Sequence, residues 1–180
     1  MQSSQLKTKV LYSKEQVAKR IGELAEQIAK DYKDKNPLLI GILNGTVIFM
    51  SDLIRALYRS GLDAQIDFLS VSSYTKGDTF SGASKVIADI RTDISDRHAL
   101  IVEDIIDTGY TLQSIREYLL SKKPKSLKIV TLLDKVKKRE VNIPVDYIGF
   151  TMQSPAWVIG YGFDTDGFGR GREDVEEKIS

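Results

Sequence analysis

Residues 100–111, LIVEDIIDTGYT, connect an apolar run to a helix through a turn of small polar residues. The run Ala99–Val102 is continuous, which predicts a strand buried on both faces of a sheet. Acidic residues and a Thr-Gly turn follow, and a helix is expected over Thr111–Leu120, ahead of Pro124. A buried strand that passes directly into a helix is typical of a βαβ unit, so this stretch predicts a parallel sheet.

The rest of the chain repeats this alternation of strands and helices. Ser13 and Gln16 form an expected capping box, and apolar residues recur at helical spacing behind them. Helices are therefore expected over Lys14–Tyr32 and Thr46–Tyr58, and further strands over Leu38–Leu43, Ala64–Ser72, Lys85–Ile90, Leu127–Leu133 and Val145–Phe150. This order predicts an α/β fold, a mostly parallel twisted sheet with helices on both faces, whose ligands bind beyond the carboxyl ends of the strands.

Three segments differ from this pattern in composition. Residues 73–84, SYTKGDTFSGAS, are rich in glycine, serine and threonine, and a mobile loop is expected there. Residues 1–12 and 151–180 are expected to form a small hood over a core of residues 37–150, within a single domain spanning 1–180. The acidic stretch Glu173–Lys178 is expected to be a short solvated helix.

Composition excludes several classes of function. The 26 basic and 25 acidic side chains nearly cancel, so no basic field covers the molecule, and binding to nucleic acid is not expected. The absence of cysteine excludes a disulfide framework, a thiolate zinc site and a cysteine nucleophile, which fits a cytoplasmic protein. No apolar run approaches the length of a signal peptide or a membrane span, so no contact with a membrane is expected.

The turn at residues 107–111 has the features of a phosphate site. Its backbone N–H groups, two threonine hydroxyls and the positive end of the helix suit a dianion, and Gly109 allows close approach. Glu103 and Asp104 can accept hydrogen bonds from a vicinal diol or hold Mg²⁺ through water. The alternative is that Asp107 or Thr108 only caps the helix while the two acids are solvated at a strand end.

The whole string resembles the phosphoribosyl-pyrophosphate signature of type I phosphoribosyltransferases, and its form VEDIIDTG is similar to that of the hypoxanthine-guanine enzymes. The similarity extends from about Leu38 to Arg170, with the elements in the family's order. The resemblance implies transfer of the 5-phosphoribosyl group from phosphoribosyl pyrophosphate to N9 of a 6-oxopurine, with Mg²⁺ as cofactor. It also implies a homodimer or homotetramer. The preference among hypoxanthine, guanine and xanthine is not set by any sequence pattern.

The resemblance assigns roles to the signature segment and to an earlier turn. It implies that Glu103 and Asp104 bind the ribose hydroxyls and Mg²⁺, and that Asp107 acts as a base toward the purine N7. The 5′-phosphate would lie on Asp107, Thr108, Gly109, Tyr110 and Thr111. Pyrophosphate would lie on the backbone of Asn44 and Gly45; many relatives carry lysine in place of Asn44, so the role of this side chain stays open.

Further residues match the family outside the signature. The resemblance implies that Ser73 and Tyr74 begin a lid, and that Lys135 donates to the purine O6. It also places Trp157 against the face of the base, Val158 at the edge of the base, Asp164 near Mg²⁺ and the base, and Arg170 on pyrophosphate. A single lysine at a strand end is otherwise usually solvated, and a single tryptophan is often a core residue.

Two alternatives from other classes stay open at this point. A regulator of the same fold would bind phosphoribosyl pyrophosphate and nucleic acid, and the only dense basic run it could use is residues 135–139. A phosphoacceptor receiver domain also places acids around Mg²⁺ at the ends of parallel strands. The hydroxyl-rich turn directly after the acids argues against the receiver domain.

Overall fold

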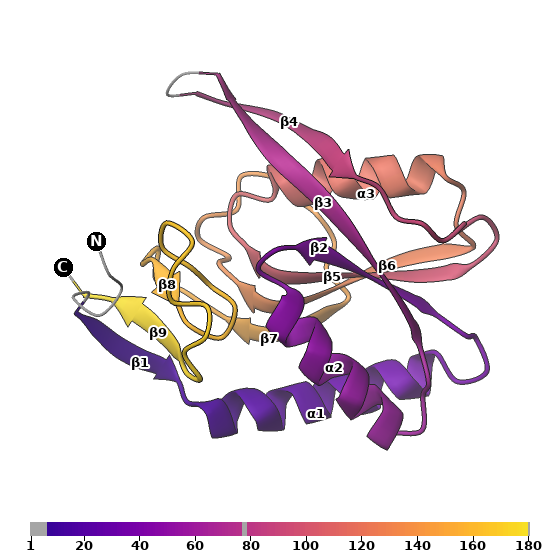
Figure 1. The fold of residues 1–180 in the computed structure, drawn as a ribbon, viewed down its shortest axis with the longest axis horizontal. Coiled ribbons are helices and arrows are strands. Elements are labelled where there is room, and N and C mark those ends of the chain that lie inside the picture. The colour runs from indigo at the N-terminus through magenta and orange to yellow at the C-terminus, as the bar shows by residue number, and fades with distance from the viewer. Residues whose placement is uncertain (1–6, 77–78, 180) are drawn as a thin grey trace.

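The computed structural model describes residues 7–76 and 79–179, although not the side chains of residues 73–84 (Figure 1). In chain order the elements are β1 (Thr8–Tyr12), α1 (Lys14–Asp31), β2 (Leu38–Leu43), α2 (Val47–Arg59), β3 (Gln65–Lys76), β4 (Thr79–Ala88), β5 (His98–Ile106), α3 (Tyr110–Ser121), β6 (Ser126–Asp134), β7 (Tyr147–Thr151), β8 (Val158–Ile159) and β9 (Val175–Lys178). None of the helices in this described part is both long and apolar enough to span a membrane.

A six-stranded sheet in the order β4-β3-β2-β5-β6-β7 forms the centre of the molecule. Strands β3, β2, β5, β6 and β7 pair in parallel, and only the edge strand β4 is antiparallel to its neighbour. The predicted mostly parallel sheet is thus confirmed. Because the parallel strands share one direction, the carboxyl ends of β2, β5 and β6 meet at one edge of the sheet.

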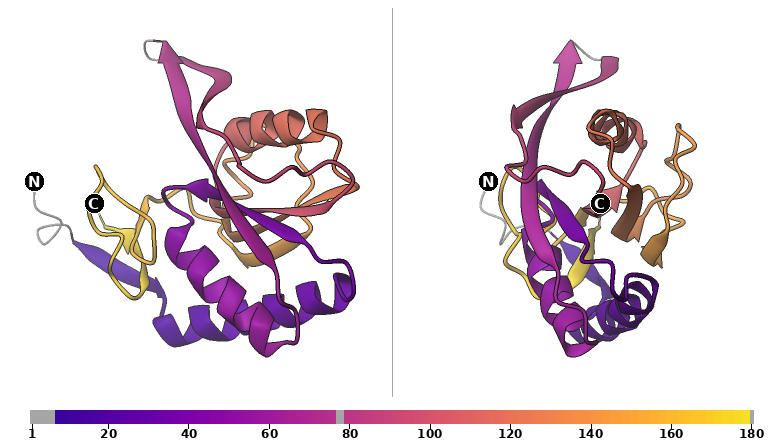
Figure 2. Two further views of the ribbon diagram at one scale, coloured as in Figure 1. Left: turned by 45° about the vertical axis from the view of Figure 1, so that its right-hand side comes forward. Right: turned by 90° about the vertical axis from the view of Figure 1, so that its right-hand side faces the viewer.

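Helices cover both faces of this sheet, as predicted (Figures 1 and 2). On one face α1 and α2 pack against β-strand side chains such as Leu39 and Leu100, and on the other α3 packs against Ile40 and Ile101. Successive strand residues point to opposite faces, so a strand buried on both faces must be apolar at every position. Burial on both faces therefore explains the continuous apolar runs in the sequence. The capping box of α1 is also present, with Ser13 and Gln16 each accepting a hydrogen bond from the backbone N–H of the other.

The two ends of the chain form a second, three-stranded sheet in the order β1-β9-β8, which we call the hood. The expected helix at Glu173–Lys178 is wrong, because β9 pairs with β1 on one side and β8 on the other. Val175 is buried in the main core, and Glu177 lies 3.8 Å from the Nζ of Lys9 across the pair of strands. Pairing with strands distant in the sequence therefore overrides the helical tendency of a glutamate-rich segment.

The expected loop at residues 73–84 is also wrong as secondary structure. The backbones of β3 and β4 continue through most of this segment as a long antiparallel hairpin, with Thr75 opposite Phe80 and Lys76 opposite Thr79. In Figure 1 this hairpin projects well beyond the rest of the sheet. Backbone pairing needs no apolar face, and threonine, tyrosine and phenylalanine favour strands, so a polar segment can continue a ladder. Gly77 and Asp78 lie outside the described residues.

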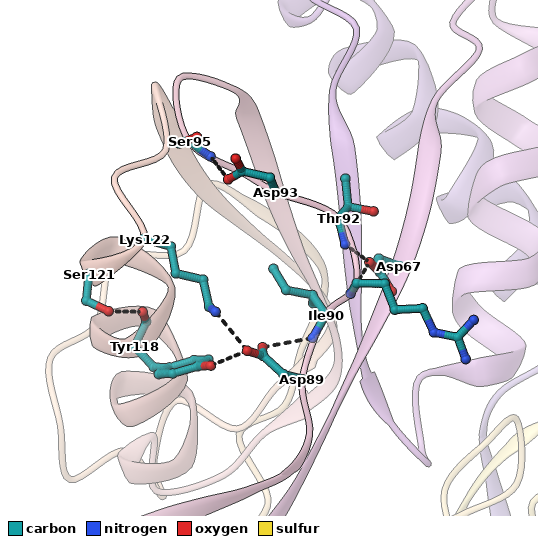
Figure 3. A network of polar contacts seen from close by, with 10 residues as sticks. Asp67, Asp89, Ile90, Thr92, Asp93, Ser95, Tyr118, Ser121 and Lys122 are labelled. Carbon is teal, nitrogen blue, oxygen red and sulfur yellow. Dashed lines mark hydrogen bonds and ion pairs between the residues drawn. The ribbon is translucent and has the colours of Figure 1, made fainter.

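Two aspartates hold the base of this hairpin, as Figure 3 shows. Asp67 on β3 accepts hydrogen bonds from the backbone N–H groups of Arg91 and Thr92 at 2.8 Å each, and its second oxygen accepts from Phe68 N–H at 2.8 Å. Asp89, directly after β4, accepts from the Tyr118 hydroxyl at 2.5 Å and from Lys122 Nζ at 2.8 Å, both on or next to α3. The chain leaving the hairpin is therefore fastened to β3 and to α3.

The Asp67 contacts predict a measurable effect on stability. Asp67→Asn turns one acceptor into an amide donor that faces backbone N–H groups, so we expect the free energy of unfolding to fall by about 1–3 kcal/mol at pH 7 in urea denaturation. Burial raises the pKa of Asp67, but the backbone donors outweigh it and the pKa is lowered overall. The stabilisation that charged Asp67 provides is therefore complete above the ordinary aspartate pKa of about 3.9. It is lost as the pH falls through the lowered pKa of Asp67 in the folded protein.

The matched control is Asp93→Asn, because exposed Asp93 accepts one backbone bond, from Ser95 N–H at 2.9 Å. We expect little change in its unfolding midpoint. Equal losses for the two variants would show that the Asp67 network does not anchor the hairpin.

Candidate active site

A cavity of about 270 Å³ lies at the carboxyl edge of the sheet, where the sequence places the site. It is lined by Ile42, Leu43, Gly45, Val71, Glu103, Asp104, Ile105, Ile106, Asp107, Thr108, Gly109, Thr111 and Leu112. A second cavity of about 190 Å³ is lined by Asp104, Ile105, Asp107, Lys135, Trp157, Val158, Phe163 and Asp164. Because Asp104, Ile105 and Asp107 line both cavities, the two lie side by side with these residues between them.

The two acids on β5 lie within the strand, which extends to Ile106, beyond the predicted end at Val102. Burial raises the pKa of Glu103 well above its ordinary value, and the neighbouring Asp104 charge raises it further. Burial also raises the pKa of Asp104, against the opposing effects of its hydrogen bonds and of the Arg170 charge. Two acids with raised pKa values in one partly enclosed site attract cations or hydroxyl donors.

The donor set of Glu103 and Asp104 fits Mg²⁺, a hard cation that prefers carboxylate oxygens and keeps several waters. A divalent cation would offset the cost of burying both carboxylates and the repulsion that further raises the pKa of Glu103. Among the described residues, however, no three such side chains converge on one preformed metal site. Asp164 has one oxygen 2.7 Å from Arg170 Nη2 and accepts from Gly167 N–H at 2.7 Å with the other, so a metal role for Asp164 stays a prediction.

The turn between β5 and α3 has the geometry of an anion site. Gly109 has a φ of 94°, a left-handed conformation that suits glycine, and α3 begins at the next residue, Tyr110. The first N–H groups of a helix lack partners within the helix, so they are available to an anion. Thr108, Gly109 and Thr111 line the larger cavity, whereas Tyr110 is half-buried and lies outside the lining. The turn is supported from behind, because the N–H groups of Glu140 and Val141 donate to the Thr108 carbonyl at 2.9 and 3.2 Å.

Gly45 brings the turn after β2 against the acids. A Cβ atom at Gly45 would lie 1.9 Å from Asp104 Oδ2, so only glycine fits this approach. Asn44, the other residue predicted for this turn, is exposed and does not line the cavity, and the peptide bond that precedes it is cis. Arg170 reaches the same region from the hood, where it donates to the Gly162 carbonyl at 2.6 Å.

The smaller cavity has one polar wall and one aromatic wall. Lys135 is 2% exposed, and its Nζ lies 3.6 Å from Asp107 Oδ1. Burial lowers the pKa of Lys135, while the Asp107 charge opposes that shift. Trp157 is half-exposed and is held by hydrogen bonds from its Nε1 to the Asp164 carbonyl at 3.1 Å and the Thr165 hydroxyl at 3.0 Å. A flat molecule with a polar edge fits between these walls.

Some site residues were not predicted. Phe163 lines the smaller cavity, and its position between two predicted residues of the hood was the available signal. Val71, from β3, lines the larger cavity, and nothing local in the sequence distinguishes it from a core valine. Lys138 lies 3.2 Å from Asp107 Oδ2, although the sequence indicates only that it belongs to the dense basic run at residues 135–139. The backbone of Ser73 and Tyr74 belongs to β3, and their side chains lie outside the described residues.

Known proteins resemble this chain over most of its length. Residues 7–166 match the phosphoribosyl transferase domain family. Hypoxanthine phosphoribosyltransferase of Haemophilus influenzae is 44% identical over 158 residues, which is 86% of this chain and 86% of that protein. Hypoxanthine-guanine phosphoribosyltransferase of Bacillus subtilis is 43% identical over 156 residues, 87% of this chain and 84% of that one. A solved hypoxanthine phosphoribosyl transferase structure from Trypanosoma cruzi has a TM-score of 0.91 at 38% identity, covering 97% of this chain and 93% of that chain.

Burial of the Lys135 ammonium at the site is expected to lower the stability of the folded protein. Lys135→Met removes a buried ammonium whose desolvation outweighs its ion pair, so we expect the free energy of unfolding to rise by about 1–2 kcal/mol at pH 7. The gain should shrink as the pH rises from the lowered folded pKa toward the unfolded value of about 10.4, because wild type then no longer buries a charge. Lys137→Met, at an exposed position, is the control in the same urea titrations. A loss of stability in Lys135→Met would contradict this balance.

Proposed function

Because the chain belongs to the phosphoribosyl transferase domain family, we propose that it transfers the 5-phosphoribosyl group from phosphoribosyl pyrophosphate to N9 of a 6-oxopurine, hypoxanthine or guanine. The products are IMP or GMP and pyrophosphate, so the protein is a glycosyltransferase of purine salvage. The observation that supports this most directly is that Asp104 and Asp107 line both of the adjacent cavities. One cavity offers an anion turn and acids to a sugar phosphate, and the other offers a polar edge and an aromatic wall to a base.

The larger cavity is proposed to bind the sugar donor. The 5′-phosphate accepts hydrogen bonds from the turn at residues 107–111, and the ribose hydroxyls donate to Glu103 and Asp104. The departing pyrophosphate lies against the backbone at Gly45, within reach of Arg170. The Arg170 side chain donates a hydrogen bond to the carbonyl of Gly162, which lies against the turn at Gly45.

The smaller cavity is proposed to bind and activate the purine. The Lys135 ammonium donates to O6, Val158 contacts the base edge, and the ring of Trp157 covers one face. As the bond from C1′ to pyrophosphate breaks, its electron pair leaves with pyrophosphate, and the N9 lone pair forms the new bond to C1′. Asp107 takes the proton that the base loses at N7. The ribosyl centre then resembles an oxocarbenium ion, and we propose that a lid beginning at Ser73 and Tyr74 excludes water from it.

Glu103 and Asp104, with Asp164 as a further candidate, would hold Mg²⁺ together with the substrate. When bound, the cation would neutralise charge on the pyrophosphate. Two adjacent charged carboxylates would otherwise repel that anionic group.

The regulator alternative finds no support. Of the basic run that it would need, Lys135 is buried, Lys138 contacts Asp107, and Arg139 forms two hydrogen bonds to Asp134 at 2.8 and 2.9 Å. The run therefore does not form a free basic surface for nucleic acid. The hydroxyl-rich anion turn and the matching relatives likewise argue against a receiver domain.

That the protein forms a homodimer or a homotetramer stays a prediction.

Base choice tests the proposed function. Purified protein with phosphoribosyl pyrophosphate and Mg²⁺ should release pyrophosphate with hypoxanthine or guanine and not with adenine, because the Lys135 ammonium would face the adenine amino group donor to donor. Such a mismatch can exclude a substrate by roughly 10⁴-fold. Excess chelator should abolish release. If adenine is preferred, or if no base supports release, the proposed function is wrong.

The role of Asp107 is tested by Asp107→Asn. We expect turnover to fall by about 10²-fold or more, because the amide cannot accept the proton from the base. The affinity for phosphoribosyl pyrophosphate, measured by calorimetry, should change little, because backbone groups hold most of the phosphate. Equal losses in affinity and turnover would reassign Asp107 to holding the turn in place.

A further inference from the structure

The carboxylate of Asp107 lies between two ammonium groups. Lys135 Nζ is 3.6 Å from Oδ1, and Lys138 Nζ is 3.2 Å from Oδ2 and donates a hydrogen bond to it. Lys135 has a role at the purine, whereas nothing in the proposed reaction so far needs Lys138. Its side chain is about one-third exposed, which separates it from the buried Lys135.

The loop that carries Lys138 is fastened to the turn that carries Asp107. Glu140 and Val141 donate backbone hydrogen bonds to the Thr108 carbonyl, and Lys138 N–H donates to the Lys135 carbonyl at 2.9 Å. The adjacent Arg139 fixes the loop further through its two bonds to Asp134 and a third to the Ile143 carbonyl at 2.8 Å. The ammonium of Lys138 is therefore held near Asp107 by the backbone as well as by charge.

The two oxygens of Asp107 differ as a result. Oδ2 accepts the hydrogen bond from Lys138, while Oδ1 is buried and accepts none from the described residues. Rotation of a carboxylate about χ2 is only weakly restrained by the side chain itself, so a partner on one oxygen decides where the other points. A charge-assisted bond is strong enough to set that orientation.

We propose that Lys138 is a positioning residue for the transfer reaction: its hydrogen bond to Oδ2 fixes the orientation of the Asp107 carboxylate, with Oδ1 against Lys135, relative to the purine. This inference rests on the proposed function, because it needs Asp107 to act on the base. Lys138 itself contacts Asp107 and lines neither cavity. The carboxylate held in this orientation then takes the proton from the base.

The experiment compares Lys138→Met with Lys138→Arg and with Lys137→Met. Lys138→Met should lower kcat by about 10-fold, because the carboxylate is no longer oriented, while KM for both substrates stays within about 2-fold. Lys138→Arg should restore most of the turnover, since a guanidinium also donates to Oδ2. Lys137→Met removes the same charge from the adjacent exposed residue and should match wild type, so a general effect of charge is excluded.

A double mutant shows whether Lys138 acts through Asp107. In Asp107→Asn protein, adding Lys138→Met should lower kcat by less than about 2-fold, because the group being oriented is already disabled. A further full 10-fold loss would overturn the proposal, and so would unchanged kcat with a raised KM for phosphoribosyl pyrophosphate, which would make Lys138 a phosphate ligand. Urea unfolding of each variant identifies any loss caused by misfolding. Wild type without transferase activity would refute the proposed function itself, whereas active wild type with an unaffected Lys138→Met would refute only this inference.

Discussion

The close approach of three chain segments around Gly45 is the contact on which the candidate site depends. A Cβ atom at Gly45 would overlap Asp104 Oδ2, and a Cβ at Gly162 would lie 2.5 Å from the Gly45 carbonyl oxygen. Two positions without side chains thus allow the turn after β2 to lie between the β5 acids and the hood. Side chains there would push these segments apart.

Near this contact the fold buries ionisable side chains, which lowers the stability of the folded protein. Glu103, Asp104 and Lys135 are each removed from water to some degree, and burial is the largest cause of the pKa shift of all three. A buried ion costs several kcal/mol, whereas a buried leucine or phenylalanine contributes only about 1.5–3 kcal/mol. The apolar layers on both faces of the sheet therefore stabilise the protein enough to tolerate an unfavourable site at its edge.

Local sequence determined the parts of the fold that neighbouring residues decide among themselves. The apolar runs at Leu38–Leu43 and Ala99–Val102 predicted strands buried on both faces, and Ser13 with Gln16 predicted the start of α1. The signature at residues 103–111 predicted an anion turn next to acids. All of these depend on the residues within about one turn or one strand of each other, where hydrogen bonding and burial pattern are readable from spacing.

Only the tertiary structure decided what depends on partners far along the chain. Residues 73–84 and 173–178 were predicted as loop and helix, but β3 pairs with β4, and β9 pairs with both β1 and β8. The contact of Lys138 with Asp107 spans 31 residues, and Gly162 meets Gly45 across more than a hundred. Backbone pairing and close packing between distant segments leave no periodic trace in either segment alone. The sequence by itself therefore determined which chemical groups line the candidate site, and the tertiary structure decided how those groups are oriented toward one another.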